Sequence, residues 1–193
     1  MSVRLAEERD IPAMLGLYAP YISTTVTFEY TLPTPEEFLR RFHTFTAQLP
    51  WLVYEEQGQV LGYAYASLPF ERAAYQWCAE PSIYLAKSVQ GKGVGKLLYR
   101  CLEEILRWQG YQVLYALVTS ENTPSLAFHE ALGYVRRADF PACGFKNNRW
   151  LGVIWLEKRL ASVESPSNVP IKWQDVVENN ENLQKVLSKI TLS

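Results

Sequence analysis

The hydrophobic pattern in the middle of the chain predicts a helix, then a buried strand, then a second helix. Apolar side chains recur at three- and four-residue spacing from Val94 to Leu106, which places one apolar stripe along a helix. Gly110 suits the position just past the end of that helix. Val113 to Val118 is short and apolar throughout, which predicts a buried strand. The second helix is expected from about Pro124 to near Gly133, since proline suits a first helical turn.

The first fifty residues predict one short strand and two helices. Val3 to Leu5 is typical of the strand, and Asp10 is expected to cap a helix that continues to about Ala19. Residues 24–30 are β-branched and aromatic, so we expect them to be extended or looped. The segment Thr34-Pro-Glu-Glu37 is a capping box with proline at the first helical position, which predicts a helix to about Thr46.

Alternating and β-branched positions predict the remaining strands. Trp51–Glu56 and Val60–Leu68 flank the turn Gln57-Gly58 and so predict a hairpin. A further strand is expected from about Tyr75 to Leu85, and alternation along Arg149–Leu160 predicts a final strand. Because strands and helices succeed one another with short loops, the pattern is typical of an α/β sheet with helices packed on its faces.

The last part of the chain differs in character from the rest. Residues 161–170 contain several serines and prolines, which is typical of a linker. Leu183, Val186, Leu187 and Ile190 form a short apolar stripe, which predicts a terminal helix that docks on the domain or on a second subunit. A disordered tail is the alternative. We therefore expect one domain over residues 1–160, followed by a linker and helical tail over residues 161–193.

Composition excludes several classes of function. The net charge of −1 gives no electrostatic case for binding nucleic acid or a membrane surface. Three widely spaced cysteines and two histidines, with no CxxC pair, argue against a zinc site and against a disulfide framework, so no metal is expected. The first ten residues hold no apolar signal region, and no apolar run approaches the roughly 20 residues of a membrane span. A soluble cytoplasmic protein is the expectation.

The segment from Ile83 to Lys96 predicts a strand, a glycine-rich turn and a helix, which together suggest a phosphate site. A helix N-terminus offers free N–H groups and partial positive charge, and glycines let the backbone approach an anion closely. A P-loop is excluded because Leu97 follows Lys96 where a serine or threonine is needed. A dinucleotide fingerprint is excluded because the third glycine comes one position early. The spacing that remains is Gln90-x-x-Gly93-x-Gly95, and a tight turn without a ligand is the alternative.

That spacing resembles the coenzyme A pyrophosphate loop of the GNAT superfamily of N-acetyltransferases. Residues from about Ser2 to Leu160 look like phosphinothricin N-acetyltransferases and the related methionine sulfoximine acetyltransferases. The matching blocks, in chain order, are Pro50–Val53, Ala73–Trp77, Glu80–Leu85, Gln90–Gly95, His129–Tyr134 and Cys143–Trp150. The resemblance implies a GNAT fold, with a central mixed β-sheet flanked by helices. It also implies a homodimer that moves acetyl groups from acetyl-CoA to the α-amino group of a small amino acid, in a ternary complex.

The resemblance also assigns residues to the cofactor. Ile83, Tyr84 and Leu85 should run beside the pantetheine arm like an added strand. The backbone from Val89 to Lys96 should hold the pyrophosphate, through Gln90, Gly91, Lys92, Gly93, Val94, Gly95 and Lys96. The side chains of Lys92 and Lys96 add charge there or are simply solvated. Asn122 and Ser125 should contact the pantetheine arm, or else cap the helix at Pro124.

Two residues match catalytic positions of the family. An ammonium cannot attack a thioester, so a base must accept its proton. Glu80 takes that role by resemblance, and burial among Tyr75, Trp77 and Tyr84 would raise its pKa. His129 stands where many GNAT enzymes have a tyrosine, and acts as acid, base or positioner, or is a satisfied structural residue. The backbone N–H near Leu85 is the expected oxyanion donor.

Acceptor recognition is assigned to a third group: Phe28, Glu29, Arg72, Tyr75 and Lys146. Arg72 would pair with an acid group of the acceptor, or is a surface arginine. Lys146 lies on the late hairpin, which in such proteins approaches a neighbouring subunit. Two other functions stay open: a GNAT enzyme that acts on a protein N-terminus, a lysine or a polyamine, and a non-catalytic acyl-CoA-binding regulatory domain.

Overall fold

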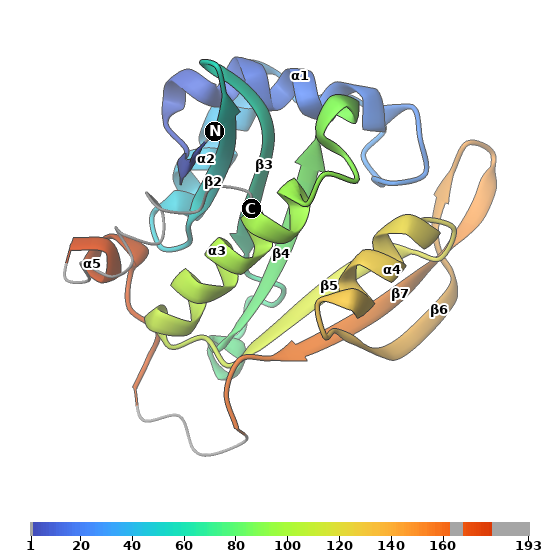
Figure 1. Cartoon of the computed structure of the whole chain (residues 1–193). Helices are drawn as coiled ribbons and strands as arrows, with labels where there is room; N and C mark the ends of the chain where they lie inside the picture. The colour runs from blue at the N-terminus through green and yellow to red at the C-terminus, as the bar shows by residue number, and fades with distance from the viewer. Residues whose placement is uncertain (1, 163–167, 179–193) are drawn as a thin grey trace.

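A seven-stranded mixed sheet organises the computed structural model, which describes residues 2–162 and 168–178 (Figure 1). Its strand order is β1-β2-β3-β4-β5-β7-β6, and every neighbouring pair is antiparallel except β4 and β5, which are parallel. The strands are β1 (Ser2–Leu5), β2 (Trp51–Glu56), β3 (Gln59–Ser67), β4 (Cys78–Leu85), β5 (Val113–Thr119), β6 (Val135–Lys146) and β7 (Arg149–Arg159). The predicted mixed α/β fold is confirmed.

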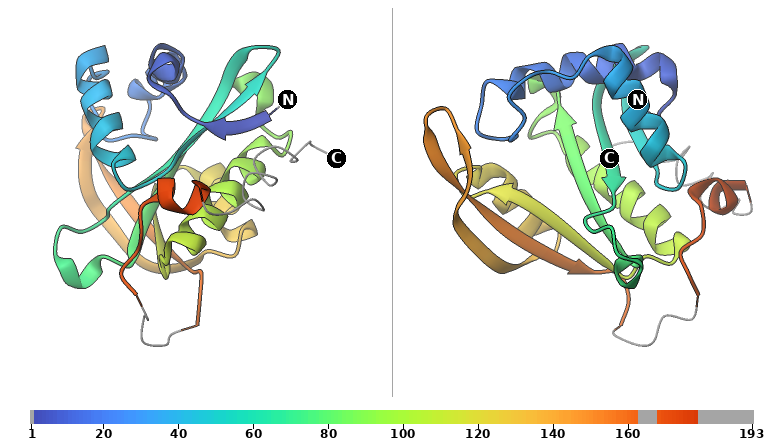
Figure 2. Two further views of the ribbon diagram at one scale, coloured as in Figure 1. Left: turned by 90° about the vertical axis from the view of Figure 1, so that its left-hand side faces the viewer. Right: turned by 180° about the vertical axis from the view of Figure 1, so that it is seen from behind.

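Helices cover both faces of the sheet (Figure 2). They are α1 (Ile11–Ile22), α2 (Pro35–Thr46), α3 (Val94–Gln109), α4 (Thr123–Ala131) and α5 (Trp173–Glu178). On one face, α1 and α2 bury Met14, Phe38 and Phe42 against Trp51 and Tyr63. On the other face, the apolar stripe of α3 packs on β3 and β4, and Leu126 of α4 and Val176 of α5 join the same core. The central helix and its predicted apolar stripe are therefore confirmed.

The sheet opens between its two parallel strands, and this opening positions the candidate site. β4 and β5 pair only at Cys78 with Val113 and at Ala79 with Leu114, and then diverge (Figure 1). The buried strand predicted at Val113–Val118 is confirmed as β5, but the predicted burial is wrong at Leu117, which lines this opening and is 39% exposed. The predicted start of β4 at about Tyr75 is also wrong, because Ala73–Tyr75 form a 3₁₀ turn and the strand begins at Cys78.

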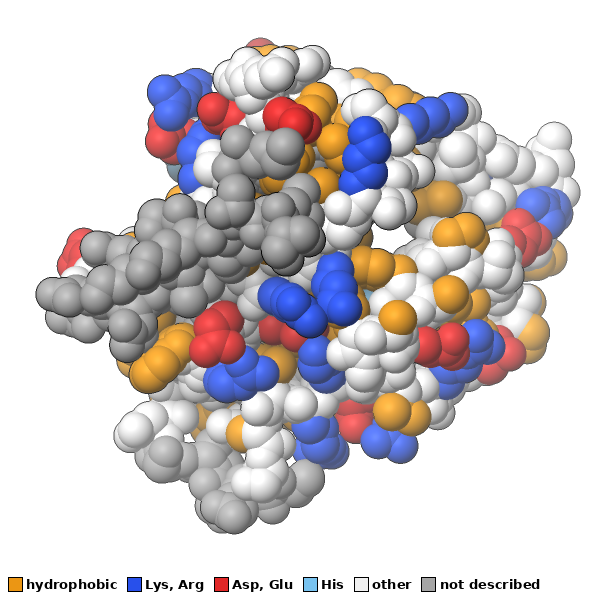
Figure 3. All heavy atoms as spheres, in the orientation of Figure 1, with side chains coloured by type: hydrophobic (Ala, Val, Ile, Leu, Met, Phe, Trp, Pro, Cys, Tyr) orange, Lys and Arg blue, Asp and Glu red, His pale blue; other side chains and the backbone are white. Residues whose placement is uncertain are grey.

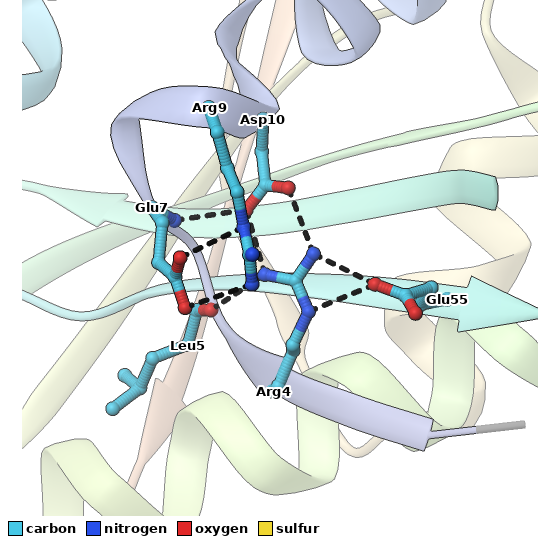
Figure 4. Close-up of polar contacts among 6 residues, drawn as sticks. All are labelled: Arg4, Leu5, Glu7, Arg9, Asp10 and Glu55. Atoms are coloured by element: carbon cyan, nitrogen blue, oxygen red, sulfur yellow. Dashed lines mark hydrogen bonds and ion pairs between the residues drawn. The ribbon is translucent and has the colours of Figure 1, made fainter. Parts of the chain in front are cut away.

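Asp10 does not cap α1 as predicted, because its carboxylate is bound elsewhere (Figure 4). Arg4 donates to both carboxylate oxygens at 2.7 and 2.8 Å, and the Glu7 N–H donates to one of them at 2.8 Å. The guanidinium also donates to Glu55 on β2. Burial alone would raise the pKa of Asp10, but these donors hold it below its usual 3.8. The helix also continues past the predicted end at Ala19, to Ile22.

The described part of the C-terminal segment packs on the domain. Trp173 of α5 donates from its indole N–H to Thr46 O at 2.8 Å, at the end of α2. Gln109, near the end of α3, donates to both Gln48 O and Ile171 O. The predicted apolar stripe of residues 183–190 lies outside the described residues. Within the described ranges, no helix combines the length and apolar character needed to cross a membrane.

Candidate active site

A cavity of about 520 Å³ fills the opening between β4 and β5. Its walls are the free edge of β4 from Pro81 to Leu85, the glycine turn, the first turns of α3, Ala116–Val118 of β5, and α4. Figure 3 shows the surface hollowed between α3 and α4. A polar ligand entering there meets unpaired strand edge on one side and a helix N-terminus on the other.

The glycine turn has the backbone shape that the predicted anion site requires. Gly91 and Gly93 have φ of 73° and 82°, in the left-handed region that L side chains rarely adopt. Gly93 is the N-cap of α3, and no side chain caps the first turn, so its N–H groups are left for a ligand. A Cβ at Gly95 would stand 3.2 Å from the Phe128 ring, so glycine there lets α3 and α4 approach.

Some donors of the turn are already engaged. The N–H groups of Val89, Gln90 and Lys92 donate to carbonyls of the turn itself. The Gln90 side chain donates to Leu85 O at 3.1 Å and to the Tyr21 hydroxyl at 3.2 Å. Gln90 thus fastens the turn to the end of β4 and to α1, and its side-chain amide serves the loop rather than a ligand.

The other predicted cofactor residues lie along the cavity. Ile83, Tyr84 and Leu85 line it from β4, and Lys96 lines it from α3. Val94 is buried in the core, so only its backbone faces the turn. Lys92 does not line the cavity. Asn122 and Ser125 line it from the start of α4, where the Asn122 side-chain oxygen also accepts the Ser125 N–H at 3.3 Å, so Asn122 caps the helix as well.

Glu80 stands where β4 parts from β5. In the β3–β4 register its neighbours Ser82 and Tyr65 share its face of the sheet, opposite the face that packs on α3. Burial raises the pKa of the Glu80 carboxyl above its usual 4.5, as predicted for a base. The expected neighbour Tyr75 lies elsewhere, with its ring packed on Phe70 at 4.6 Å. Glu80 lies next to Pro81, the first β4 residue that lines the cavity.

His129 is buried, 4% exposed, and both ring nitrogens are occupied. Nδ1 donates to Ser125 O at 2.8 Å, and Nε2 lies 3.0 Å from the Tyr99 hydroxyl. A carbonyl only accepts, so the proton of the neutral ring is on Nδ1 and Nε2 accepts from Tyr99. Burial lowers the pKa of His129 below 6.5. The ring is therefore neutral at pH 7, and the Tyr99 hydroxyl lies between it and Pro81 O.

Sequence reasoning missed Tyr99. The side chain is fully buried on α3, lines the cavity, and has its hydroxyl 3.3 Å from Pro81 O. Burial raises its pKa well above 10, so it stays protonated. The available signal was its position one helical turn after Gly95, on the helix face that the glycine turn already marks.

Tyrosines also gather on the Glu80 face of β3 and β4 and on α1, and of these Tyr84 was named from the sequence, but not Tyr18, Tyr63 or Tyr65. Tyr84 packs on Tyr18 of α1 at 4.8 Å and on Tyr63 at 5.3 Å, and Tyr63 stacks on Tyr65 at 6.1 Å. Burial, and to a smaller degree the Glu80 charge, raises the pKa of Tyr65 to about 12. We call these four residues the tyrosine cluster. Tyr63 and Tyr65 alternate along one strand, which places them on the same face. Their contacts with Tyr84 and Tyr18 join segments that are far apart in the chain.

The predicted acceptor residues divide into two groups. Phe28 and Glu29 lie in the loop between α1 and α2, where Glu29 forms an ion pair with Arg41. Lys146 is buried at the end of β6 and donates to Thr27 O of the same loop at 2.6 Å. Arg72 and Tyr75, in contrast, lie in the exposed connection before β4.

Within the described ranges, no group of three His, Cys, Asp or Glu side chains could hold a metal ion. The three cysteines are free, with Cys143 exposed, Cys78 half-buried and Cys101 buried.

Comparisons with known proteins agree with this geometry. Residues 3–155 match the acetyltransferase (GNAT) domain family. The phosphinothricin N-acetyltransferase of Streptomyces viridochromogenes is 35% identical over 151 residues, which cover 78% of this chain and 82% of that protein. The L-methionine sulfoximine/L-methionine sulfone acetyltransferase of Salmonella typhimurium is 30% identical over 169 residues, covering 86% and 98%. A GNAT superfamily phosphinothricin acetyltransferase from Sinorhizobium meliloti, solved in complex with acetyl-CoA, superposes with a TM-score of 0.83 at 32% identity, covering 88% of this chain and 94% of that chain.

Proposed function

This chain belongs to the GNAT acetyltransferase family, and we propose that it transfers an acetyl group from acetyl-CoA to the α-amino group of a small amino acid. Family membership and its relatives make it an acetyl-CoA-dependent N-acetyltransferase. The proposed acceptor is of the phosphinothricin or methionine sulfoximine type, because proteins with those names are similar over more than three quarters of the chain.

The observation that supports the proposal is the position of Glu80 between the cavity and the tyrosine cluster. On one side the cavity offers a strand edge and a helix N-terminus. On the other side the tyrosine cluster forms an aromatic wall. A long anionic cofactor suits the first space, and a small amine suits the second, so the two would meet where β4 parts from β5.

The residues present fit acetyl-CoA. The first turn of α3 and the left-handed glycines at 91 and 93 suit its pyrophosphate. Lys96, which lines the cavity, adds positive charge. The edge of β4 from Ile83 to Leu85 is proposed to pair with its amides, with Asn122 and Ser125 on the opposite wall. Bound acetyl-CoA supplies the acetyl group as a thioester.

Glu80 is proposed as the base that takes the proton of the acceptor amine. Burial raises its pKa above the usual 4.5, which makes the carboxylate a better proton acceptor than an exposed glutamate. His129 is proposed as a positioner of the Tyr99 hydroxyl, because the neutral ring has no second proton to give. The amine is proposed to attack the thioester directly, in a ternary complex, since acetyl-CoA and the acceptor would reach Glu80 from opposite sides.

The acceptor is proposed to contact Phe28, Glu29 and the tyrosine cluster. Glu29 lies close enough to the tyrosines for its charge to add to the burial that raises the pKa of Tyr84. Arg72 and Tyr75 precede β4, and we propose that Arg72 pairs with an acid group of the acceptor. Lys146 has its ammonium on Thr27 O, so we propose that it acts on the loop rather than on the acceptor.

A homodimer is also proposed, from the face of β5 and β7 that none of the described helices covers (Figure 2). Aromatic rings cluster there, where Phe70 contacts Tyr115 and Trp155, and Trp155 contacts Phe140. Apolar surface of this kind is typical of an interface between subunits. Sedimentation equilibrium tests it: a mass twice that of one chain supports the dimer, and a monomer at all concentrations rejects it.

The test of the proposed reaction is release of free thiol from acetyl-CoA with a panel of acceptors. The panel contains phosphinothricin, methionine sulfoximine, methionine sulfone, the common amino acids, spermidine and a peptide. Selective turnover of the first three supports the proposal. Selective turnover of spermidine or the peptide rejects the acceptor class, and acetyl-CoA binding without any turnover rejects an enzyme acting on this panel.

A further inference from the structure

The β6–β7 hairpin holds the loop that joins α1 to the stretch before α2, from Ser23 to Tyr30. We call residues 23–30 the acceptor loop, a name that rests on the proposed function. In Figure 1 this loop lies beside the tip of the hairpin. Because the two segments are more than 110 residues apart in sequence, their contacts are tertiary and not a property of the loop itself.

Polar contacts join the loop to the hairpin at several points. Lys146 Nζ donates to Thr27 O at 2.6 Å, Asn147 Nδ2 donates to Ser23 O at 3.3 Å, and the Tyr30 hydroxyl donates to Phe145 O. All three acceptors are backbone carbonyls. The hairpin supplies the donor in two of these bonds, and the loop supplies it at Tyr30. The loop is thereby fixed along most of its length by groups of the hairpin.

The closest apolar contact is between Phe28 and Gly144. A Cβ at position 144 would lie 2.5 Å from one ring carbon of Phe28 and 2.8 Å from two others. Carbon atoms do not approach this closely, so any side chain there moves the ring. The φ of Gly144 is not in the left-handed region, so the backbone itself would accept alanine. Glycine at 144 is therefore required by Phe28 and not by the local turn.

The contact between Lys146 and Thr27 is buried. Lys146 is only 3% exposed, and burial lowers its pKa below 10.5 although the Glu29 charge opposes this. Thr27, whose carbonyl Lys146 holds, also shares a 2.7 Å hydrogen bond between its own hydroxyl and that of Tyr18. Thr27 therefore connects the hairpin with the tyrosine cluster.

The inner side of the acceptor loop reaches the candidate site. Val26 lines the cavity beside β4. Glu29 pairs with Arg41 of α2, and its charge acts on Tyr18 and Tyr84. A shift of the loop would therefore move Val26, Phe28 and Glu29 together. Hairpin residues that contact the outer side of the acceptor loop can therefore fix the positions of these three side chains.

We propose that Gly144 and Lys146 are positioning residues for acceptor selection, which fix the position of the acceptor loop although they lie outside the site. Gly144 does so by making room for the Phe28 ring, and Lys146 by holding Thr27 O. Acceptor preference then depends on the hairpin as well as on the loop's own sequence. We expect cofactor binding to depend on the hairpin much less, because Val26 is the one residue of the acceptor loop that lines the cavity, and the glycine turn has no contact with the hairpin tip among the interactions of the described residues.

A double-mutant cycle of Gly144→Ala and Phe28→Ala tests this, with Gly16→Ala as the control. A Cβ at Gly16 would meet nothing within 4 Å beyond its own helix backbone, so Gly16→Ala makes the same chemical change without a clash. Two quantities are measured: hydrogen exchange of amides 23–30 by mass spectrometry, and steady-state kinetics with the best acceptor of the panel. The first needs no activity, so failure of the loop inference and failure of the proposed reaction are separate results.

Gly144→Ala is expected to speed exchange in residues 23–30 by about 10-fold or more, since local openings govern exchange. It should lower kcat/KM for the acceptor by about 10- to 100-fold, with the KM for acetyl-CoA within about twofold. Gly144→Ala should add nothing once Phe28 is alanine, because the clash is gone. Lys146→Met should loosen the same amides without a clash.

Unchanged exchange in Gly144→Ala, or effects of the two substitutions that simply add, would overturn the proposal. So would loosening of equal size in Gly16→Ala. If no acceptor is turned over, the exchange data alone decide the role of Gly144, and the proposed reaction is rejected independently.

Discussion

The Tyr99 hydroxyl lies 3.0 Å from His129 Nε2 and 3.3 Å from Pro81 O, so one proton has two acceptors. While His129 is neutral, Nε2 accepts that proton. If His129 were protonated, Nε2 would become a donor to the Tyr99 oxygen, and the hydroxyl proton would turn to Pro81 O. The protonation state of a buried ring thus decides which way a hydroxyl on the cavity wall points.

The first prediction concerns the titration of His129. Burial lowers its pKa below 6.5, and the Ser125 carbonyl opposes that only in part. The chain has two histidines, so His43→Gln leaves one ring to follow by NMR. We expect the His129 ring to remain neutral below pH 6.5. A ring that titrates above 6.5 would contradict burial as the dominant cause.

The same shift sets a dependence of stability on pH. Below 6.5 the unfolded chain binds a proton at this histidine, while the folded chain does not until its lower pKa is reached. This contribution to the free energy of unfolding is therefore complete above 6.5 and is lost as pH falls from 6.5 to the folded pKa. Urea unfolding at several pH values across this window should show the loss of unfolding free energy in wild type. In His129→Gln the unfolding free energy should change less with pH.

Glu80→Gln is expected to lower kcat by about 10²- to 10⁴-fold, because the amide cannot accept the amine proton. The KM for acetyl-CoA should change little, since Glu80 does not line the cavity. The raised pKa of Glu80 also predicts an acid limb of kcat/KM above 4.5 in wild type, as the base form is lost on acidification. Glu71→Gln, in the exposed β3–β4 connection, is the matched control. Equal activity of Glu80→Gln and wild type over roughly pH 6 to 9 would remove Glu80 as the base.

Gly93→Asp is expected to abolish acetyl-CoA binding, because its carboxylate would occupy the anion site at the start of α3. The substitution also strains a backbone with φ of 82°, so the strain needs its own control. Gly133→Asp provides it, with φ of 89° and nothing within 4 Å, away from the cavity. Each variant should lose about 1–2 kcal/mol of stability from the left-handed conformation. Calorimetry should find binding lost in Gly93→Asp alone; unchanged affinity there would reject the pyrophosphate site.

The features that sequence could predict are those set by near neighbours. The Thr34 and Glu37 side chains form both bonds of the predicted capping box, at 3.2 and 2.9 Å, because all the groups lie within four residues. Gly110 ends α3 with φ of 99°, as its position implied. The glycine turn is also local, so its left-handed conformations followed from residue type.

The features that sequence missed depend on groups far apart in the chain. The local capping rule predicted Asp10 as an N-cap. Its carboxylate instead accepts from Arg4, whose guanidinium also donates to the distant Glu55. His129 could be matched to a family position, yet its tautomer depends on Tyr99, which is 30 residues away. Such pairs form only when the sheet has brought their elements together, so the hydrophobic periodicity of the sequence does not indicate them.

The last prediction concerns α5, which lies beyond the residues that match the family. The Trp173 indole donates to Thr46 O, one of the carbonyls that the end of α2 leaves unpaired. Trp173→Phe keeps the packing but removes this donor, so it should cost about 1 kcal/mol of unfolding free energy in urea. Trp108→Phe is the control, because that indole is on a ring 54% exposed and bonds only to surface Glu104 among the described residues, so it should cost less than about 0.5 kcal/mol. Equal losses in the two variants would show that the Trp173 indole bond does not stabilise the end of α2, and would leave that role to Gln174, which also donates to Thr46 O at 3.1 Å.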